Sequence, residues 1–437
     1  MKKNNRSERA FAIVAAILVA FGVCSGAEAP TYATLYQFTG YLGGPDGSYP
    51  IAPVVVGPGG VLYGTTGSGG IVNATCPQGC GTVFSLVPPA AAGMPWAETI
   101  LHSFTAGADG YWPSTSLTIA ANGALYGTTT AGGLPGFGTV FALMPPTRSG
   151  GPWTEQILYS FAGPDGPGGD GVGPWGRLIA GADGVLYGTA AFGGAYGWGI
   201  AFSLKPSPGG GSWTETILHN FGAEGDGSDV LSGLTASGGV LYGTTYFGGT
   251  SNYGVVFSLT PPSSAGGDWT EAVLYSFAGG NDAENPEFGN LVVGAGGVLY
   301  GTTYDGGEYG KGTVFSLTPP ASQGAAWSES VLLSFSYRSG ESPDGGLAID
   351  KAGNLYGTTS AGGNSTKGLG TVFRLAPPAE AGGPWKFTDL HTFTNSTNGI
   401  VPMSGVTIDA ENKVIYGTTS GYYYIPQNGG TVYSLTF

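Results

Sequence analysis

Positive charge is scarce in this sequence, and its scarcity excludes a class of partners. Lys and Arg number 14 among 437 residues, Asp and Glu number 28, and the formal net charge is −14. Such a chain cannot form the basic stripe that neutralises phosphates, so we expect no nucleic-acid binding. Long hydrophobic runs are also missing: after residue 23, no stretch approaches the ~18 consecutive apolar residues of a membrane helix. We therefore expect no transmembrane span in the mature chain.

Catalytic motifs are absent as well. The sequence has no G-x-S-x-G elbow, no H-E-x-x-H motif and no phosphate-binding loop at the start of a helix. Its three histidines, His102, His219 and His391, lie far apart in the chain. This spacing argues against a metal triad, and we predict neither a metal site nor a cofactor from them.

Cysteine is rare too, and only Cys76 and Cys80 lie beyond the N-terminal segment. A turn through Pro77 and Gly79 can bring their Cα atoms within bridging distance, and an exported protein folds in an oxidising compartment. We therefore predict a local disulfide that pins one loop and stabilises the fold little, because the closed ring is short. A metal site is the alternative, but no further cysteine or histidine lies nearby.

The first 29 residues have the pattern of an export signal. Basic residues up to Arg9 precede an apolar stretch from 11 to 23, and small residues follow at 25–27 and 27–29. We predict that residues 1–29 are a signal peptide and that the protein is secreted, extracellular or on the cell surface. An uncleaved anchor is one alternative, although about thirteen apolar residues are short for a span. A lipoprotein modified at Cys24 is another, which the residues before Cys24 do not favour.

Glycine and proline are abundant instead, with 84 and 30 residues. In an aperiodic chain this content would indicate disorder. Aromatic residues at 12% and hydrophobic residues at 41% are nevertheless enough for a large core. We therefore expect the glycines to serve turns and close packing.

A pentapeptide recurs along the whole chain. LYGTT or a close variant begins at residues 62, 125, 186, 241, 299, 355 and 415, with a period of roughly 58 residues. Each repeat also contains a string that follows a proline, such as 113–119, then GTVFSL, as at 312–317, and WTExxLYSF, as at 153–161. These short strings, joined by Gly, Pro, Asn and Asp turns without helical periodicity, predict four strands of about five residues per repeat. Each repeat is therefore expected to form one antiparallel sheet.

Seven such sheets predict an all-β fold, a seven-bladed β-propeller of four-stranded antiparallel blades. Only six complete WTExxLYSF-like strings are present, whereas Leu35-Tyr36-Gln37-Phe38 near the N-terminus matches the end of that string. We therefore expect an N-terminal strand to complete the last blade and close the ring, which leaves no unpaired edge. Residues 30–437 are predicted to form a single domain and a monomer. A linear β-solenoid is the alternative, but it has no reason to split a repeat between the two ends.

The ring geometry predicts which residues face the axis. Side chains must be small where the inner strands converge, and the column expected there is Pro53, Ser116, Arg177, Gly233, Asn290, Gly346 and Gly405. Arg177 is the one charge in that column, and we predict that it binds an anion in the channel or pairs with Asp165 or Asp170. Gly64 and its counterparts are expected to give room to a ring of the neighbouring blade.

The repeats resemble those of the Gloeobacter–Verrucomicrobia (GloVer) family, found in "choice-of-anchor" exported bacterial proteins. The likeness rests on LYGTTxxGG (62–70, 125–133, 299–307, 355–363), GTVFSLxPP (81–89, 312–320) and WTExxLYSF (153–161), and it extends over about 35–437. The resemblance implies a secreted or surface-displayed β-propeller. Relatives often end in a surface-sorting tail, whereas Phe437 closes the last repeat here, so release or non-covalent attachment is expected.

Function is expected in the loops, because scaffold strings repeat and binding loops diverge. The connections from the fourth to the next first string are acidic, and those from the second to the third string, predicted on the same face, are aromatic. Carboxylates beside exposed rings are typical of surfaces that bind sugars. The candidate ligand-binding residues are Asp170, Arg177, Tyr196, Trp198, Asp226, Asp229, Tyr253, Asp305 and Tyr309.

Structural interpretations compete with these candidates. Asp-Gly is a common tight-turn pair, so the aspartates at 46, 109 and 344 can serve their own backbone. Tyr196, Trp198 and Tyr309 can pack between blades. The glutamate of WTE recurs in five repeats, which indicates a scaffold role, and the three histidines stand where other repeats have tyrosine. Calcium bound by Asp170, Asp226 and Asp229 is a weaker alternative, because no D-x-[DN]-x-[DN]-G pattern is present.

The sequence supports two functional hypotheses. The first is a non-enzymatic exported protein that binds or displays extracellular polysaccharide or a surface partner through the acidic and aromatic loop face. The alternative is a carbohydrate-active enzyme, a glycoside hydrolase or lyase, that uses a carboxylate pair such as Asp170 and Asp226. Such an enzyme requires two close carboxylates from different blades at the mouth of a deep pocket.

Overall fold

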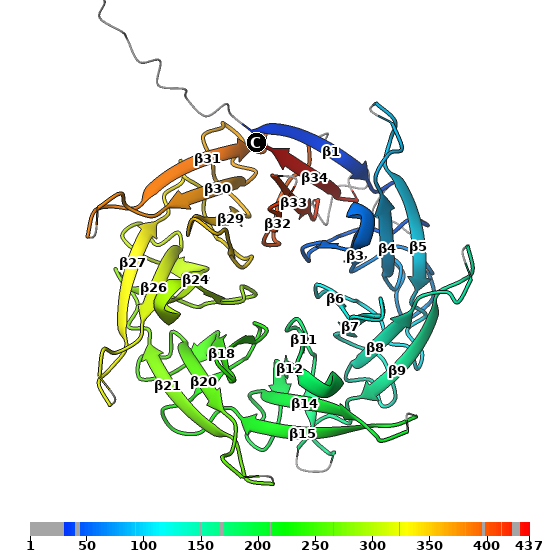
Figure 1. Cartoon of the computed structure of the whole chain (residues 1–437), viewed down its shortest axis with the longest axis horizontal. Helices are drawn as coiled ribbons and strands as arrows, with labels where there is room; N and C mark the ends of the chain where they lie inside the picture. The colour runs from blue at the N-terminus through cyan, green and yellow to red at the C-terminus, as the bar shows by residue number, and fades with distance from the viewer. Residues whose placement is uncertain are drawn as a thin grey trace, which may run out of the picture.

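The computed structural model describes residues 30–39, 44–91, 93–148, 150–166, 169–209, 211–264, 266–322, 324–380, 382–395, 398–411, 413–421 and 429–437, and the backbone but not the side chain of Asp183. The expected signal peptide, residues 1–29, and the aromatic run 422–424 lie outside the described residues. In the described part, seven four-stranded antiparallel sheets surround an axis as a seven-bladed β-propeller without an α-helix (Figure 1). No helix there is long and apolar enough to span a bilayer.

The blades follow one another along the chain, and each runs from the axis outward. Blade 1 contains β2 (Val55–Val56), β3 (Leu62–Thr66), β4 (Thr82–Val87) and β5 (Ala97–Ser103). Blade 2 contains β6 (Thr118–Ile119), β7 (Leu125–Thr129), β8 (Thr139–Met144) and β9 (Thr154–Ser160). Blade 3 contains β11 (Ile179–Ala180), β12 (Leu186–Ala190), β14 (Ile200–Pro206) and β15 (Trp213–Asn220). Blade 4 contains β17 (Thr235–Ser237), β18 (Val240–Thr245), β20 (Val255–Thr260) and β21 (Thr270–Ser276).

The remaining three blades have the same order. Blade 5 contains β23 (Val292–Val293), β24 (Leu299–Thr303), β26 (Thr313–Thr318) and β27 (Ser328–Ser334). Blade 6 contains β28 (Ala348–Ile349), β29 (Leu355–Thr359), β30 (Thr371–Ala376) and β31 (Lys386–Thr392). Blade 7 contains β32 (Thr407–Asp409), β33 (Val414–Thr419), β34 (Thr431–Thr436) and, outermost, β1 (Thr31–Gln37). Short 3-10 turns join the first two strands in three blades, η1 (Pro58–Gly60), η2 (Ala182–Gly184) and η3 (Ala295–Gly297).

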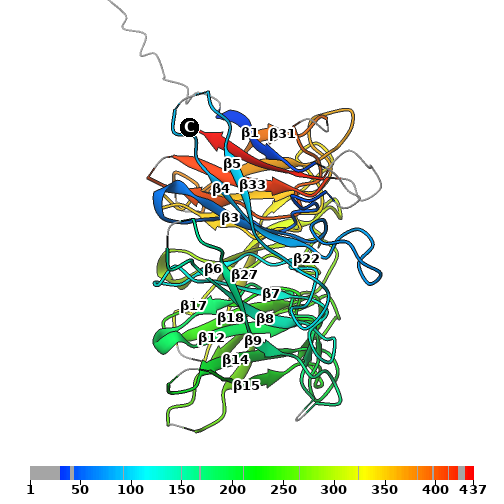
Figure 2. The ribbon, with the colours of Figure 1, turned by 90° about the vertical axis from the view of Figure 1, so that its right-hand side faces the viewer.

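The N-terminal strand closes the ring, as the repeat arithmetic predicted. β1 pairs antiparallel with β34, with Thr31 opposite Thr436 and Gln37 opposite Thr431. The two strands lie side by side at opposite ends of the colour scale in Figure 1, and Figure 2 shows the blades packed in sequence from the side. Both ends of the described fold therefore meet in one blade.

The innermost strands are shorter than expected, with two or three residues instead of about five. At most boundaries, the chain just before the inner strand bonds to the neighbouring blade. Thr65 of β3, for example, donates its hydroxyl to the Thr115 carbonyl of blade 2 at 3.0 Å. The same bond joins six of the seven boundaries, with the donor threonines Thr65, Thr128, Thr189, Thr302, Thr358 and Thr418.

The tyrosine and the glycine of LYGTT have separate packing roles. The tyrosine contacts a ring of the next blade: the centroids of Tyr63 and Trp153 lie 6.0 Å apart. The glycine admits a ring of its own blade, since a Cβ on Gly64 would lie 2.5 Å from Cζ of Phe84, its partner across the strand pair. The expectation that a neighbouring blade supplies this ring was therefore wrong. The aromatic ring opposite the glycine comes from the adjacent strand.

Phenylalanines hold the blades together at every boundary. The last residue of each LYSF-like string packs against the ring of the third strand in the next blade, as Phe38 does with Phe84, whose centroids lie 5.2 Å apart. Equivalent pairs join Phe104 to Phe141, Phe161 to Phe202, Phe221 to Phe257, Phe277 to Phe315, Phe335 to Phe373 and Phe393 to Tyr433. Each such pair adds about 0.5–1.5 kcal/mol beyond the area it buries.

The close approach at Gly64 leads to a first prediction. We expect Gly64→Ala to lower the free energy of unfolding by about 1–3 kcal/mol, because the added methyl group overpacks Phe84. Thermal and denaturant unfolding measure the loss. In the Phe84→Leu background the same substitution should lower the free energy of unfolding clearly less, because the ring that the new methyl group would overlap is absent. An equal cost in both backgrounds would contradict the assigned contact.

Candidate functional site

The acidic and aromatic connections lie on the same face, as expected. Two-stranded pairs join a fourth-to-first connection to the following second-to-third connection in three blades: β10 (Gly171–Val172) with β13 (Phe192–Gly193), β16 (Gly227–Ser228) with β19 (Phe247–Gly248), and β22 (Ala283–Glu284) with β25 (Asp305–Gly306). Isolated bridges make the same connection in three other blades. We call this surface the loop face.

A left-handed residue fastens each loop of this face to the preceding blade. Asp229 has φ 57° and donates its backbone N–H to the Trp198 carbonyl at 2.9 Å. The residues in this position are Tyr49, Trp112, Gly173, Asp229, Asn285, Ser342 and Val401, all with φ between 54° and 64°. A positive φ is unusual for bulky and β-branched side chains, so these positions store local strain. The same bond holds the loops of neighbouring blades in a fixed register.

The predicted acidic residues serve blade boundaries. Asp170 is 1% exposed, and its carboxylate accepts the Tyr159 hydroxyl at 2.9 Å and the backbone N–H groups of Ala162 and Gly171 at 2.6 Å each. Tyr159 also contacts Glu215 of the next blade at 3.3 Å. Asp226 likewise accepts from His219 Nε2 at 2.8 Å and from backbone N–H groups of residues 222 and 227. The oxygens of both aspartates are thus used within the protein.

This arrangement recurs at five boundaries. In each, a tyrosine or histidine of one outer strand, an aspartate of the following connection and a glutamate of the next outer strand come together. These boundary triads are Tyr36, Asp46 and Glu98; His102, Asp109 and Glu155; Tyr159, Asp170 and Glu215; His219, Asp226 and Glu271; and Tyr275, Asp282 and Glu329. The glutamates of the WTE string therefore lie between blades, as a scaffold role predicts.

Burial raises the pKa of the triad glutamates into the neutral range. Desolvation, followed by the charge of the neighbouring aspartate, raises the pKa of Glu98, Glu271 and Glu329 to about 7. The same causes raise the pKa of Glu155 and Glu215 to about 8. A protonated glutamate can donate a hydrogen bond to the aspartate beside it, which avoids the repulsion between two close carboxylates.

The other two boundaries replace the triad with uncharged contacts. Leu333 stands in the position of Tyr159, Phe387 stands in that of Glu215, and both pack into one apolar cluster. At the last boundary, Tyr32 takes the glutamate position and stacks on His391, with ring centroids 3.9 Å apart and planes 10° from parallel. At the first of these boundaries both positions are apolar, whereas at the last one the histidine is kept and a stacked tyrosine replaces the glutamate.

Two triads contain the ligand types of a metal site. The ligand atoms of His102, Asp109 and Glu155, and those of His219, Asp226 and Glu271, lie within 4.8 Å of one another. Three other triads use a tyrosine hydroxyl in the same place and need no ion for their contacts. We therefore interpret both histidines as residues of the blade boundary: His219 hydrogen-bonds to Asp226, whereas Nε2 of His102 lies 3.3 Å from Glu155 and is buried without a hydrogen-bond partner among the described residues. The calcium alternative at Asp170 and Asp226 has no support, because their oxygens already accept N–H and O–H groups.

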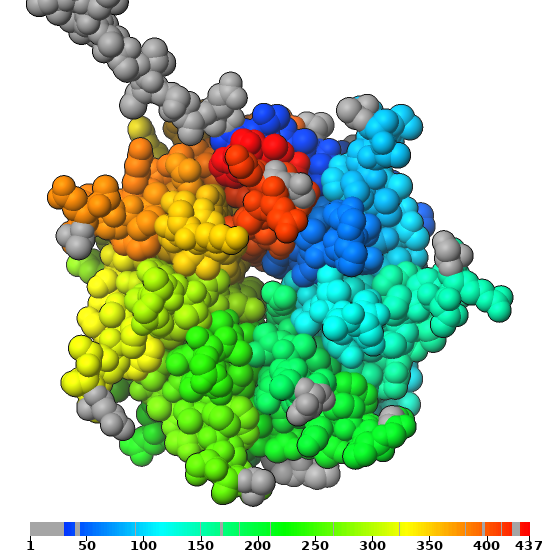
Figure 3. All heavy atoms as spheres, viewed as in Figure 1, coloured from blue at the N-terminus to red at the C-terminus, as the bar shows by residue number. Residues whose placement is uncertain are grey.

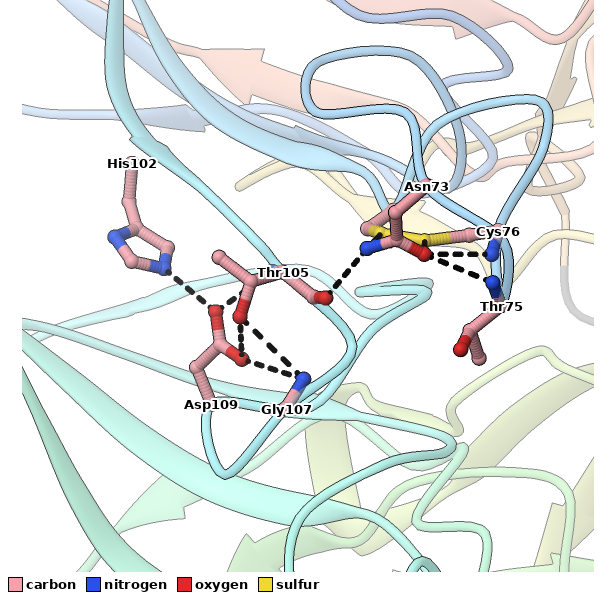
Figure 4. The surroundings of a disulfide bond; sticks show 8 residues. Asn73, Thr75, Cys76, His102, Thr105, Gly107 and Asp109 are labelled. Atoms are coloured by element: carbon pink, nitrogen blue, oxygen red, sulfur yellow. Dashed lines mark hydrogen bonds and ion pairs between the residues drawn. A yellow bond between two sulfur atoms is a disulfide. The ribbon is translucent and has the colours of Figure 1, made fainter.

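The predicted disulfide supports one of these triads. The sulfur atoms of Cys76 and Cys80 lie at bonding distance, with Cα atoms 5.2 Å apart. Asn73 in the same loop donates its amide to the Thr105 carbonyl at 2.7 Å, and Thr105 in turn binds Asp109 (Figure 4). The bridged loop therefore braces the connection that carries Asp109.

The structure brings three predicted site residues together between blades 3 and 4. Trp198, Asp226 and Asp229 line a pocket of about 400 Å³ with Phe247, Asn252 and several glycines. Trp198 is 50% exposed and rests on Gly222, while Oδ1 of Asp229 is buried without a hydrogen-bond partner. The Asn252 side-chain carbonyl accepts the Gly248 N–H at 3.1 Å. We call this the loop-face pocket.

The remaining candidates are dispersed over the loop face. Tyr196 and Tyr309 are each 55% exposed and belong to different blades, so they do not pack between blades. Tyr253 covers Gly279 with its ring. Asp305 is half-buried, and desolvation raises its pKa. None of these four lines the loop-face pocket.

The axial channel is the second cavity of the described fold. It has a volume of about 490 Å³, and six of the seven residues predicted to face the axis line it, all except Gly233. Figure 3 shows a narrow opening at the centre of the ring. Arg177 lies in this channel, and no ion pair joins it to Asp165 or Asp170 in the described structure. The expectation of that pairing was therefore wrong.

Solved structures with a similar arrangement share little sequence with this chain. The extracellular domain of a protein from B. thetaiotaomicron superposes with a TM-score of 0.50 at 11% identity, over 93% of this chain and 41% of that one. The phage phi92 endosialidase gives 0.44 at 12% identity, over 93% and 68% of the two chains. A gluconolactonase from Xanthomonas campestris gives 0.42 at 13%, over 80% and 90%. Such distant likenesses concern the fold alone and have no bearing on activity.

Sequence comparison is more specific. No curated protein is significantly similar to the chain. The model of the Gloeobacter/Verrucomicrobia repeat matches residues 22–172 and again 173–433, which together span nearly the whole chain. The motifs on which the resemblance rested are the strands that build and join the blades. The chain belongs to the Gloeobacter/Verrucomicrobia repeat family.

Proposed function

We propose that this protein is an exported, non-enzymatic binding protein whose loop face recognises an extracellular carbohydrate. Residues 1–29 serve as the export signal, and residues 30–437 form the secreted or surface-bound propeller domain, which acts as a monomer. The observation that carries the proposal is the loop-face pocket, where a half-exposed tryptophan lies beside a carboxylate whose Oδ1 has no hydrogen-bond partner in the described part of the chain.

The pocket supplies the groups that sugar recognition requires. The exposed side of the Trp198 ring offers an apolar surface for the CH face of a pyranose. The Asp229 carboxylate and the Asn252 side-chain amide group are the polar groups available for hydroxyls, and desolvation raises the pKa of Asp229. The glycines of the pocket leave backbone groups accessible to a ligand. A volume of about 400 Å³ is in the range of small-ligand sites.

The enzyme alternative receives less support from the geometry. Asp170 and Asp226 belong to different boundary triads, and their oxygens are occupied by hydrogen bonds within the protein. The close pair Asp170 and Glu215 lines neither cavity. In the pair Asp226 and Glu271, Asp226 does line the loop-face pocket, but His219 and backbone N–H groups occupy its oxygens, and Glu271 lies outside the pocket. A glycosidase requires such a pair beside the substrate.

A glycan array followed by calorimetric titration of the best ligand tests the proposal. We expect Trp198→Ala to weaken binding by about tenfold or more, because the ring is the central apolar contact of the pocket. Tyr309→Ala is the matched control, since it removes an equally exposed ring outside the pocket and should leave the affinity unchanged. An array without a hit, or equal affinities for the Trp198→Ala variant and the parent protein, would overturn the proposal.

A further inference from the structure

We propose that the axial channel is a separate binding site for a small ring-bearing carboxylate, whose charge is held by Arg177. This site is independent of the loop-face pocket, since the two cavities share no lining residue. The proposal therefore stands or fails apart from carbohydrate binding on the loop face.

The first argument is the isolation of the guanidinium. Arg177 is the one ionisable residue among those that line the channel, and no hydrogen bond or ion pair engages it in the described part of the chain. Desolvation by the surrounding walls lowers its pKa, although an arginine stays charged at neutral pH. Its side chain is nevertheless exposed to solvent, so an anion that enters the channel can reach a guanidinium that no described protein group occupies.

The second argument is a further donor in the same cavity. Asn290 lines the channel from blade 5, and its side-chain carbonyl accepts the Gly233 N–H at 2.8 Å. This bond orients the amide so that its NH₂ group is left for a ligand, because no described group accepts from it. A carboxylate has two oxygens and matches a guanidinium with two parallel hydrogen bonds. The channel thus offers donors and no competing carboxylate.

The third argument concerns the body of the ligand. Trp175 and Phe288 line the cavity, with ring centroids 5.5 Å apart, and Trp112 packs against Trp175 at 5.9 Å. This aromatic cluster suits a ring, either the CH face of a sugar acid or a planar aromatic acid. The volume of about 490 Å³ accommodates a molecule of that size.

The charge of the ligand follows from the surroundings. With a net charge of −14, the protein repels anions from its surface, so one arginine can compensate one negative charge but not two. A monocarboxylate fits this balance, whereas inorganic phosphate is a dianion for much of the time at neutral pH. The channel should therefore discriminate against phosphate.

Calorimetric titration of the purified protein tests the site. The probes are D-glucuronate and benzoate, which distinguish a sugar acid from an aromatic acid, with D-glucose and inorganic phosphate as controls. We expect one of the two carboxylates to bind with one-to-one stoichiometry, and glucose and phosphate to bind at least about tenfold more weakly. Binding of neither carboxylate, or glucose binding as well as glucuronate, would overturn the proposal.

Variants locate the binding within the channel. Arg177→Gln should weaken carboxylate binding at least about tenfold, whereas Arg148→Gln, which removes an exposed charge outside the channel, should leave it unchanged. If Arg177→Gln fails to fold, Asn290→Asp provides the second test, because a carboxylate in the channel would repel the ligand. Trp198→Ala should have no effect on these titrations. Unchanged carboxylate affinity in a folded Arg177→Gln or Asn290→Asp variant would contradict the site.

Discussion

Removing residues 30–39 should open the ring and cost at least about 5 kcal/mol of unfolding free energy. The deletion takes away β1, the outer strand of blade 7, and with it Phe38, whose truncation alone would cost about 3–5 kcal/mol in a packed core. It also removes Tyr36 from the first boundary triad. Because small proteins are stable by only about 5–15 kcal/mol, most of the stability should be lost.

The exposed edge provides a specific readout. Without β1, the strand β34 presents an unpaired and largely apolar edge, TVYSLT, which favours aggregation. Size-exclusion chromatography should therefore show oligomers, and thermal unfolding should begin at a much lower temperature. A synthetic peptide of residues 30–39 should restore the monomer by adding the missing strand, and a scrambled peptide should not. A monomeric truncated protein with an unchanged melting temperature would show that β1 does not close the ring.

Raising the pH from 6.5 to 8.5 should destabilise the protein by on the order of 1 kcal/mol for each triad glutamate. The folded protein raises the pKa of these groups to about 7 or 8, whereas in an unfolded chain it is about 4.3. Folding therefore takes up protons in this range. The stabilising contribution is full below the unfolded pKa and is lost as the pH rises through the folded values.

One opposing effect acts at the lower end of this pH window. Burial lowers the pKa of His391 to about 4, whereas it is about 6.5 in an unfolded chain, so the free energy of unfolding falls as the pH decreases toward and below 6.5. Above about pH 7.5 this histidine is neutral in both states. Denaturant unfolding at a series of pH values in the window measures the summed contribution of the triad glutamates with Glu287 and Asp344, because burial likewise raises the pKa of these two groups to about 7 and about 8.

Glu215→Gln should remove part of this pH dependence. Glutamine has the shape of a protonated glutamate and can still donate a hydrogen bond to Asp170, but it cannot ionise. We expect it to be more stable than the parent protein at pH 8.5 and nearly equal to it at pH 6.5. Glu380→Gln, an exposed change, is the control and should leave the slope unaltered. Stability that is constant or rises from pH 6.5 to 8.5 would show that the triads hold ionised glutamates.

The number of blades and their closure were predictable because both depend on local patterns. LYGTT marks the second strand of every blade, and the split of the last repeat required a strand from the N-terminus. The position of Arg177 near the axis followed from its column among small residues. Each of these inferences needed only the alignment of the repeats with one another, because equivalent positions in the repeats have equivalent places in the blades.

Contacts between blades were not predictable in the same way. Glu215 meets Asp170 and Tyr159 although these residues belong to separate repeats, and no local pattern records the pairing. The left-handed conformations could not be predicted for a different reason. Tyrosine, tryptophan and valine, found at positions 49, 112 and 401, are residue types that disfavour a positive φ. Gly173, Asp229 and Asn285 tolerate this conformation better, so only these three positions carry a signal in the sequence.

The loop-face pocket was foreseeable in part. Trp198, Asp226 and Asp229 were expected on one face, and the structure brings them into one cavity. The carboxylate of Asp226 is not free for a ligand, because it accepts hydrogen bonds from backbone N–H groups of its own connection. Its role is therefore structural. Asn252 was not predicted as a pocket residue, because its position depends on a turn whose geometry no sequence motif specifies.

The pairing of Thr31 with Thr436 has a consequence for the order of the chain. Both termini of the described fold lie in adjacent strands of one blade, an equivalent aromatic pair joins every blade to the next, and a threonine bond joins six of the seven boundaries. A circular permutant that joins these termini and begins between any third and fourth strand would contain the same strands in the same cyclic order. The closed ring therefore does not depend on which repeat comes first in the chain.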